Sequence, residues 1–311
     1  MKLVLLLSGE NLELAREEAL AVAETKSYKQ DKNVLTLETE NDLRRLAFTR
    51  IILQQLFSCK TKDLEKQAQN FNWQEVYKEN FCVRIKGKTE LTEKSLASII
   101  WRKLTNPRVD LENPKTNIHF LFTEKNVHCG LLLYENKEKF RERRPHLREG
   151  FHPTSMQPKL ARALVNLSGI KKGQTILDPF CGTGGILIEA GLIGCKLKGN
   201  DIDPNMLELT KKNLKHFKLK AELIQKDALL LNTKADAIVT DLPYGKGSYH
   251  NISLETLYRR FLEKSCSMLK PNKRLVAVFP KKIRAKKLKI IKELESYVHS
   301  SLTRHIIIAK K

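Results

Sequence analysis

The first 135 residues alternate between apolar strand patterns and amphipathic helical patterns. Short strand patterns and helix-period patterns of this size predict two small α+β units, one before about residue 60 and one after it. The first unit is expected to hold strands at Lys2–Leu7 and Val34–Leu37, a helix at Leu12–Ala23 and a helix start at Asn41–Leu43. The second is expected to hold a strand at Phe81–Ile85, a helix at Glu93–Leu104, and strands at Asn117–Thr123 and Val127–Tyr134 that form a hairpin.

After Pro158 the pattern becomes a regular alternation of helices and short apolar strands. Such alternation predicts a mostly parallel sheet covered on both faces, with ligands at the carboxyl ends of its strands. The expected helices are Lys159–Leu167, Gly185–Leu192, Pro204–Phe217, Leu254–Leu269 and Ile283–Leu294. The expected strands are Thr175–Leu177, Lys196–Gly199, Glu222–Gln225, Ala237–Val239, Arg274–Phe279 and His305–Ala309.

The excess of positive charge predicts a polyanionic partner. The 57 lysines and arginines exceed the 35 aspartates and glutamates by 22, and the segment 137–148 between the two halves is strongly basic. A surplus of this size favours nucleic acid as the partner, with a membrane surface as the second choice. The length of 311 residues predicts two or three domains.

The cysteines and histidines predict neither a metal site nor a disulfide framework. The six cysteines have no C-x-x-C spacing, and His128, His216 and His250 have no evident ligand partners. The N-terminal apolar run Leu3–Leu7 is too short for a signal peptide, and no stretch approaches a membrane span. We therefore expect a soluble cytoplasmic protein.

The sharpest chemical signal is a glycine-rich turn between a strand and a helix. Asp178-Pro179-Phe180-Cys181-Gly182-Thr183-Gly184 follows the strand at Thr175–Leu177 and matches neither the P-loop nor the G-x-G-x-x-G spacing. An acidic residue at the start of the loop disfavours phosphate and suits a cationic amine. The next strand ends at Asp201, where a carboxylate can hold a ribose diol. Together these residues predict a nucleoside ligand without phosphates; the alternative is a glycine-rich turn with surface acids.

A second motif, Asp241-Leu242-Pro243-Tyr244, follows the strand at Ala237–Val239 and precedes Gly245-Lys246-Gly247-Ser248. A carboxylate and a main-chain carbonyl there can accept hydrogen bonds from an exocyclic amine, and Tyr244 offers a face for a flipped base. Pro243 favours an extended conformation at Leu242 and so preserves the acceptor pair. The alternative is a simple turn after a buried strand.

These two motifs resemble those of class I methyltransferases that use S-adenosylmethionine, and the second resembles the (D/N)-P-P-Y motif of enzymes that methylate exocyclic amines. By that resemblance Asp178 lies near the amino-acid end of the cofactor, Asp201 binds the ribose and Asp227 reaches the adenine. The full cofactor set that the resemblance implies is Asp178, Pro179, Gly182, Thr183, Gly184, Asp201, Ile202, Asp227 and Ala228. The catalytic set is Asp241, Leu242, Pro243 and Tyr244, with Leu242 standing where the family has proline.

The N-terminal half carries a second resemblance. Val109-Asp110-Leu111-Glu112-Asn113-Pro114 looks like a signature of the THUMP RNA-binding domain, which usually follows a ferredoxin-like domain; the alternative is an Asn-Pro turn before a strand. The segments 143–146, 151–167 and 299–304 resemble the archaeal and eukaryotic enzymes that methylate N2 of guanosine 10 in tRNA. The expected domains are ferredoxin-like (1–59), THUMP (60–140), a basic linker (141–157) and a Rossmann-like methyltransferase domain (158–311).

The expected activity is S-adenosylmethionine-dependent methylation of the N2 amine of a guanosine in tRNA, at position 10, giving N2-methyl- or N2,N2-dimethylguanosine. Three alternatives stay open: another tRNA guanosine, an rRNA guanosine, and a non-catalytic RNA-binding protein or partner-dependent subunit. The sequence also leaves open whether a small activator protein is required. No metal is expected.

Overall fold

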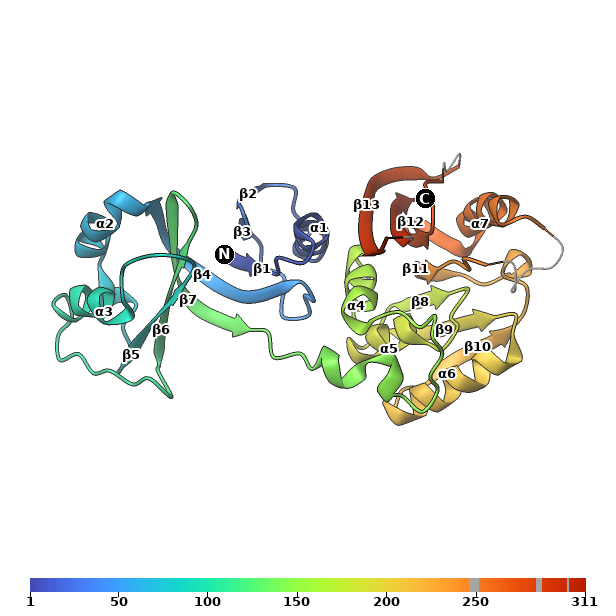
Figure 1. Cartoon of the computed structure of the whole chain (residues 1–311), viewed down its shortest axis with the longest axis horizontal. Coiled ribbons are helices and arrows are strands. Elements are labelled where there is room, and N and C mark those ends of the chain that lie inside the picture. Colours follow the sequence, from blue (N-terminus) through green and yellow to red (C-terminus); the bar gives the residue numbers. More distant parts are fainter. Residues whose placement is uncertain (246–251, 284–286, 301) are drawn as a thin grey trace. The chain divides into compact units, whose positions relative to one another are not determined.

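The chain forms two compact units, each described here by itself. The computed structural model describes residues 1–245, 252–283, 287–300 and 302–311 (Figure 1). The first unit comprises Met1–Leu12, Ala23–Arg44 and Thr49–Lys137. The second comprises Glu13–Val22, Arg45–Phe48 and Glu138–Lys311, so it is built from three separate segments of the sequence.

The first unit is organised around one seven-stranded sheet in the order β2-β3-β1-β4-β7-β6-β5. Its strands are β1 (Lys2–Leu7), β2 (Tyr28–Asp31), β3 (Val34–Glu38), β4 (Thr49–Lys60), β5 (Phe81–Lys86), β6 (Thr116–Phe122) and β7 (Asn126–Glu135). Strand β4 pairs antiparallel with β1 on one side and with β7 on the other. The predicted hairpin of β6 and β7 is confirmed.

Two helices of the first unit, α2 (Leu64–Asn70) and α3 (Glu93–Trp101), pack on an aromatic core. Thr92 and Ser95 form a reciprocal capping box that fixes the start of α3. The core centres on Trp73, which is 1% exposed, with Phe57, Phe81 and Phe120 around it. Burial of these large rings stabilises this half of the sheet.

The second unit is a seven-stranded sheet in the order β10-β9-β8-β11-β12-β14-β13. The first five strands in this order run parallel, and β14 pairs antiparallel with both β12 and β13. The strands are β8 (Thr175–Asp178), β9 (Lys196–Asp201), β10 (Ala221–Gln225), β11 (Ala235–Asp241), β12 (Leu269–Phe279), β13 (Lys289–His299) and β14 (Leu302–Lys310). The strand order reverses at β8, where parallel sheets place their ligands.

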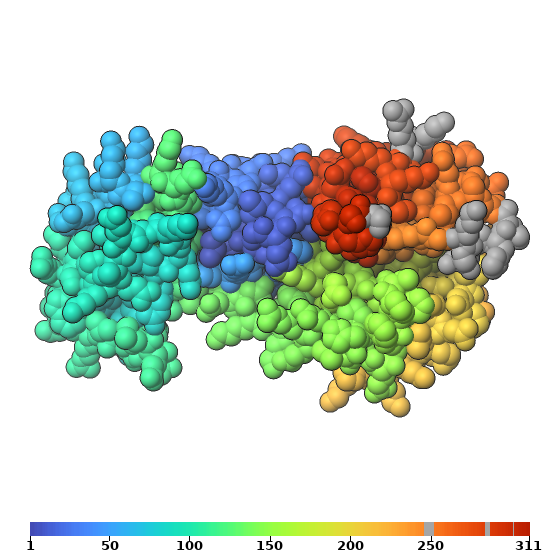
Figure 2. Space-filling model, in the orientation of Figure 1, coloured from blue at the N-terminus to red at the C-terminus, as the bar shows by residue number. Residues whose placement is uncertain are grey.

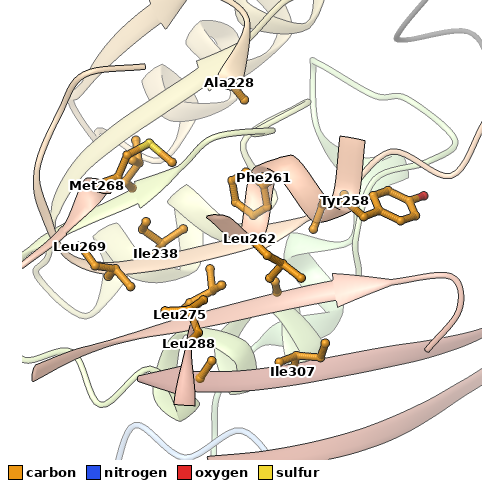
Figure 3. Packing of buried hydrophobic residues seen from close by; sticks show 14 of the residues in the cluster. Ala228, Ile238, Tyr258, Phe261, Leu262, Met268, Leu269, Leu275, Leu288 and Ile307 are labelled. Atoms are coloured by element: carbon orange, nitrogen blue, oxygen red, sulfur yellow. The ribbon is translucent and has the colours of Figure 1, made fainter. Parts of the chain in front are cut away.

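Among its described residues, the second unit has five α-helices: α1 (Leu12–Ala23, of which Glu13–Val22 belong here), α4 (Pro158–Leu167), α5 (Gly185–Leu192), α6 (Pro204–His216) and α7 (Leu254–Met268). Helix α7 packs Phe261 and Leu262 against Ile238 and Leu275 of the sheet, as Figure 3 shows. Helix α6 is at the surface in Figure 2, in agreement with the exposure of its lysines. No helix in the described ranges has the length and apolarity to cross a bilayer.

The predicted helix at Ile283–Leu294 is wrong. Residues 284–286 lie outside the described part, and from Lys289 the chain forms strand β13, which pairs antiparallel with β14 with register shifts at Ile290/Lys292 and Tyr297/His299. In β13 the side chains of Ile290, Lys292 and Leu294 are partly or fully buried, while their neighbours are exposed. The spacing of the apolar residues alone could not distinguish this period of two from a helical period.

The predicted helix start at Asn41–Leu43 is also wrong, because Asn41 is in a bend and a turn follows at Arg44 and Arg45. The side chain of Asp42 accepts a hydrogen bond from the amide of Arg44 at 2.9 Å, a local alternative to helical hydrogen bonding. The long strand β4 and the helix α2 were not predicted. In β4 the consecutive residues Ile51, Ile52 and Leu53 are all buried, so the strand lacks the regular alternation of apolar and polar positions that would have indicated it.

The motif Val109–Pro114 forms a tight turn. The carboxylate of Asp110 accepts hydrogen bonds from the amides of Glu112 and Asn113 at 3.0 and 2.9 Å, and these bonds lower the pKa of Asp110. Asn80 joins the turn to β5 by accepting from the amide of Lys115. The assignment of this unit to ferredoxin-like and THUMP domains stays a prediction.

Candidate active site

A cavity of about 720 Å³ opens at the carboxyl edge of the second sheet, where β8, β9 and β11 end. It is lined by His152, Thr154, Ser155, Met156, Asp178, Phe180, Cys181, Gly182, Thr183, Gly185, Ile186, Asp201, Ile202, Asp203, Pro204, Met206 and Asp241–Gly245. Residues of both sequence motifs therefore line the same cavity.

The glycine turn between β8 and α5 leaves open space for a ligand. Gly182 lines the cavity and has φ +50°. A Cβ built at this position would have no heavy atom within 4 Å, so the space beside it is open. Gly184 has φ +80° and caps α5. The hydroxyl of Thr210 donates to the carbonyl of Gly182 at 2.6 Å and fixes the turn from α6. The two glycines allow left-handed backbone conformations that other residues rarely adopt.

Asp201, at the end of β9, orders this turn as well as facing the cavity. One carboxylate oxygen accepts from the amide of Gly182 at 2.8 Å, and the other accepts from the amide of Asp203 at 3.1 Å. Burial raises the pKa of Asp201, which these two hydrogen bonds oppose. The side chain thus links the glycine turn to the residues that start α6.

Asp178 ends β8 beneath the cavity and is 1% exposed. Its carboxylate accepts from the hydroxyl of Thr240 at 2.7 Å and from the amide of Phe180 at 3.3 Å. Burial raises its pKa to about 8, and the nearby carboxylates of Asp201 and Asp241 act in the same direction. A cationic group bound in the cavity would favour the ionised form of Asp178.

Asn200 joins three strand ends and was not identified from the sequence. Its side-chain amide donates to the carbonyls of Pro179 and Lys226 at 2.9 and 3.0 Å, and its main-chain carbonyl accepts from the amide of Cys181 at 2.8 Å. These bonds hold the turns after β8 and β10 on either side of β9. An amide beside an acidic strand end was a signal that could have been found in the sequence.

Asp241 and Tyr244 interact directly in the second motif. The hydroxyl of Tyr244 donates to Oδ1 of Asp241 at 2.5 Å. Nε of Arg304, from β14, donates to the same hydroxyl at 3.2 Å and lies 3.8 Å from Oδ2 of Asp241. Burial raises the pKa of Asp241 to about 6, although Arg304 and Tyr244 act to lower it.

Leu242 and Pro243 anchor the motif to the core. The amide of Leu242 donates to the carbonyl of Val278 at 3.1 Å, and the Leu242 side chain is 2% exposed within the core cluster beneath α7. The hydroxyl of Tyr258, on α7, donates to the carbonyl of Pro243 at 2.6 Å. These contacts fix the backbone that carries the carbonyl of Leu242. Of the loop expected after Gly245, residues 246–248 lie outside the described part.

The linker at 141–157 forms part of the cavity wall through His152, Thr154, Ser155 and Met156, a role that its sequence did not indicate. Ser155 shares a hydrogen bond with the hydroxyl of Thr183 at 2.8 Å. Gly150 exchanges hydrogen bonds with the side chain of Asn213 on α6, both at 2.9 Å. This segment therefore contacts the glycine turn instead of being only a solvated linker.

Buried ion pairs hold the start of the same segment. Arg143 and Arg162 both bind the carboxylate of Glu189 on α5 at 2.8 Å, and Arg143 also binds Glu138 at 2.8 Å. Glu189 is fully buried and Arg162 is 2% exposed. Removal of one member would leave a buried charge without its partner.

The structure brings most of the predicted site residues to the cavity: Asp178, Gly182, Thr183, Asp201, Ile202, Asp241, Leu242, Pro243 and Tyr244. The remaining four, Pro179, Gly184, Asp227 and Ala228, are not among the lining residues. Asp227 follows β10 at the same sheet edge, and its carboxylate accepts from the amide of Leu229 at 2.8 Å. Ala228 is buried in the core cluster.

The charges of the lining residues define what the cavity suits. Asp178, Asp201, Asp203 and Asp241 line it, and the described lining includes no lysine or arginine. Such a wall suits a cationic ligand with hydroxyl groups and opposes a nucleoside phosphate. Within the described ranges, no group of three His, Cys, Asp or Glu side chains is arranged to hold a metal ion.

Sequence families match both parts of the chain. The family described as an RMKL-like methyltransferase domain matches residues 145–298, and one described as DNA methylase matches residues 8–212. The second match ends before Asp241.

Known proteins give the narrower assignment. The tRNA (guanine(10)-N2)-dimethyltransferase of Methanothermobacter thermautotrophicus is 43% identical over 236 residues, which cover 73% of this chain and 70% of that protein. The protein of the same name from Pyrococcus abyssi is 34% identical, covering 79% of each chain. The crystal structure of TrmN from Thermus thermophilus matches all of both chains with a TM-score of 0.51 at 20% identity and supports the methyltransferase fold. By these similarities, the chain belongs to the tRNA (guanine(10)-N2)-dimethyltransferase family.

Proposed function

We propose that this protein transfers methyl groups from S-adenosylmethionine to the exocyclic N2 amine of guanosine 10 in tRNA, giving N2-methyl- and N2,N2-dimethylguanosine. The observation that carries the proposal is the single cavity lined by both the Asp178–Asp201 wall and the Asp241–Tyr244 wall. A donor held by the first wall and an amine held by the second would meet in the same space.

The cofactor half of the cavity fits S-adenosylmethionine by its chemistry. The open space above Gly182 admits a ligand close to the backbone, and Asp201 can accept from ribose hydroxyls. Asp178 can hold the ammonium group, whose charge would favour the carboxylate form. When bound, this cofactor supplies a methyl group on a positively charged sulfur. We assign Pro179, Thr183, Gly184, Ile202, Asp227 and Ala228 to the same binding region.

The second half of the cavity would orient the target amine. The lone pair of an exocyclic guanine amine is delocalised into the ring, so the nitrogen is a poor nucleophile. The carboxylate of Asp241 and the main-chain carbonyl of Leu242 can each accept one N–H, which aims the lone pair toward the donor. In the present conformation Tyr244 occupies Oδ1 of Asp241, so the amine must bind Oδ2 or displace the tyrosine hydroxyl.

Asp241 also provides a route for the proton. Transfer of the methyl group that the cofactor supplies would leave a positive charge on the amine nitrogen, next to the carboxylate of Asp241. The nitrogen then releases a proton to Asp241 or to solvent. A carboxylate with a pKa of about 6 accepts a proton more readily than one with an ordinary pKa.

We infer that the N-terminal unit is an RNA platform, with the boundaries 1–59 and 60–140 expected for ferredoxin-like and THUMP domains. The motif at 109–114 supports this inference, and the net charge of +22 over the whole chain supports an RNA partner for the protein as a whole. Phosphate contacts would position the tRNA while the cavity reads one extruded base. An rRNA guanosine is a second candidate substrate, because an rRNA large subunit methyltransferase of Buchnera aphidicola is 26% identical over 235 residues.

The test uses the full chain, labelled cofactor and unmodified transcripts of tRNA and rRNA, followed by nucleoside analysis and position mapping. We expect label in N2-methylated guanosine at tRNA position 10. The variant Asp241→Ala should lower turnover by about 10² or more with cofactor affinity nearly unchanged. Exposed Glu208 on α6 provides the control, Glu208→Ala. Label confined to rRNA, or wild-type turnover by Asp241→Ala, would overturn the proposal.

A further inference from the structure

Arg304 reaches the second motif from a strand far along the sequence. It belongs to β14, where it pairs with Ser296 of β13, and the next residue, His305, pairs with Phe279 of β12. Its side chain is 13% exposed, so the guanidinium is largely removed from bulk water. The antiparallel placement of β14 beside β12 brings this arginine to the same sheet edge as Asp241.

The contacts of Arg304 converge on the carboxylate of Asp241 by two routes. Nε lies 3.8 Å from Oδ2 of Asp241, and the same atom donates to the Tyr244 hydroxyl at 3.2 Å. That hydroxyl donates to Oδ1 of Asp241 at 2.5 Å. The guanidinium carbon is also 6.0 Å from the centre of the Tyr244 ring. One arginine thus restrains both the carboxylate and the aromatic ring beside it.

The other titratable neighbours of Asp241 do not offer this compensation. Asp178, from β8, is a second carboxyl group that interacts with Asp241 electrostatically. Tyr258, from α7, also faces it, and its ionised form would repel the carboxylate. The positive charge of Arg304 therefore offsets part of the cost of keeping Asp241 ionised in a buried, acidic cavity.

We propose that Arg304 is a positioning residue of the methyl-transfer site, which holds the Asp241 carboxylate ionised and aligned, directly and through the Tyr244 hydroxyl. The inference rests on the proposed function, since it assigns Arg304 to the same reaction. The inference goes beyond that function, because it makes the pH below which methylation is lost depend on a residue of β14.

The sign of the pH effect follows from the charges. Burial holds the pKa of Asp241 at about 6 with Arg304 present. Loss of the guanidinium destabilises the carboxylate relative to the protonated acid, so the pKa rises, by about 1 unit or more for an opposite charge at this range. Below that pKa the carboxyl group is neutral and a weaker acceptor for the amine. Activity is then lost at low pH and returns as the pH rises.

The experiment measures single-turnover methylation of tRNA between pH 5 and 9 for the wild type, Arg304→Gln and Arg304→Lys. Lys310→Gln removes one positive charge from the same strand as a control for RNA affinity. In Arg304→Gln the acid limb should move up by about 1 unit, so the rate falls about fivefold more at pH 6 than at pH 8. Arg304→Lys and Lys310→Gln should keep the limb near its wild-type position.

A second arm separates this role from general support of the fold. In the Asp241→Asn background, which has no carboxylate at this position, Arg304→Gln should no longer move the pH profile. An unchanged acid limb in Arg304→Gln, or an equal shift in the Asp241→Asn background, would overturn the assignment. If Arg304→Gln does not fold, Arg304→Lys carries the test. An acid limb displaced by a full unit in Arg304→Lys would overturn the assignment, because the lysine keeps the positive charge. Absence of methylation in the wild type would instead contradict the proposed function.

Discussion

Substitution of Leu242 by proline would turn the second motif into the D-P-P-Y form that it resembles, yet the structure predicts a loss of stability. The amide of Leu242 donates to the carbonyl of Val278 at 3.1 Å, which proline cannot do. The Leu242 side chain is 2% exposed and packs in the core cluster, where the smaller proline ring fills less space. Both losses are losses of contacts in the folded state. Proline at 242 would also restrict Asp241 to an extended conformation, but Asp241 already has that conformation in β11, so no strain is added there.

The two losses can be given magnitudes. A buried carbonyl left without its donor costs about 1–3 kcal/mol. A core side chain shortened by about one methyl group costs roughly 0.5–1.5 kcal/mol. The free energy of unfolding of Leu242→Pro should therefore fall by about 2–4 kcal/mol. The carbonyl of residue 242 is retained, so turnover per folded molecule should change little.

Calorimetric or urea unfolding of the full chain measures the first quantity, and single-turnover methylation well below the melting temperature measures the second. Leu242→Ala is the matched control, since it keeps the amide and loses packing at about 2–5 kcal/mol. A Leu242→Pro variant with wild-type stability would refute the importance of the Val278 hydrogen bond. A stable but inactive variant would refute the role of the residue 242 carbonyl as acceptor.

Three further outcomes are expected. Asp201→Ala should weaken S-adenosylmethionine binding in calorimetry by about tenfold or more, because a charge-assisted contact and the hydrogen bond to Gly182 are both lost; unchanged affinity would remove Asp201 from the site. Tyr244→Ala should weaken productive base capture by about 1–3 kcal/mol, whereas Tyr244→Phe, which keeps the ring, should be milder in the same kinetic assay; equal effects would count against stacking. Affinity for tRNA should fall by about 10³ or more between 50 and 200 mM salt if six or more phosphates are neutralised, and a flat salt dependence would contradict the platform.

The elements of the parallel sheet were predictable because each strand and helix there has its own local signature. The glycine turn at 182–184 and the acidic strand ends Asp178 and Asp201 follow from sequence order alone, since parallel strands end at one edge. The cavity lining at these positions agrees with that expectation. Local pattern was sufficient where neighbouring strands in the sheet were close in the chain.

The remaining features depend on long-range pairing that one segment does not reveal. Strand β13 has a mixed apolar pattern that also suits a helix, and its partner β14 decides the outcome. Nothing in the sequence indicated the positioning role that we propose for Arg304, because its distance from Asp241 is set by the pairing of β14 with β12. The hydroxyl of Tyr258 likewise donates to the main-chain carbonyl of Pro243, a partner that neither sequence segment reveals by itself.

Helix α1 contributes Glu18, a residue near the start of the sequence, to the core of the second unit. This limits where the chain can be divided. Glu18 is fully buried and accepts from the amides of Ala47 and Phe48 and from the side chain of Asn166 on α4, at 2.7 to 2.9 Å. A gene fragment that begins near residue 145 would encode Asn166 without this acceptor and α4 without the helix that binds it. The N-terminal unit, which we propose to bind RNA, therefore cannot be exchanged among relatives at that junction; a viable chimera must carry α1 and residues 45–48 together with the C-terminal half.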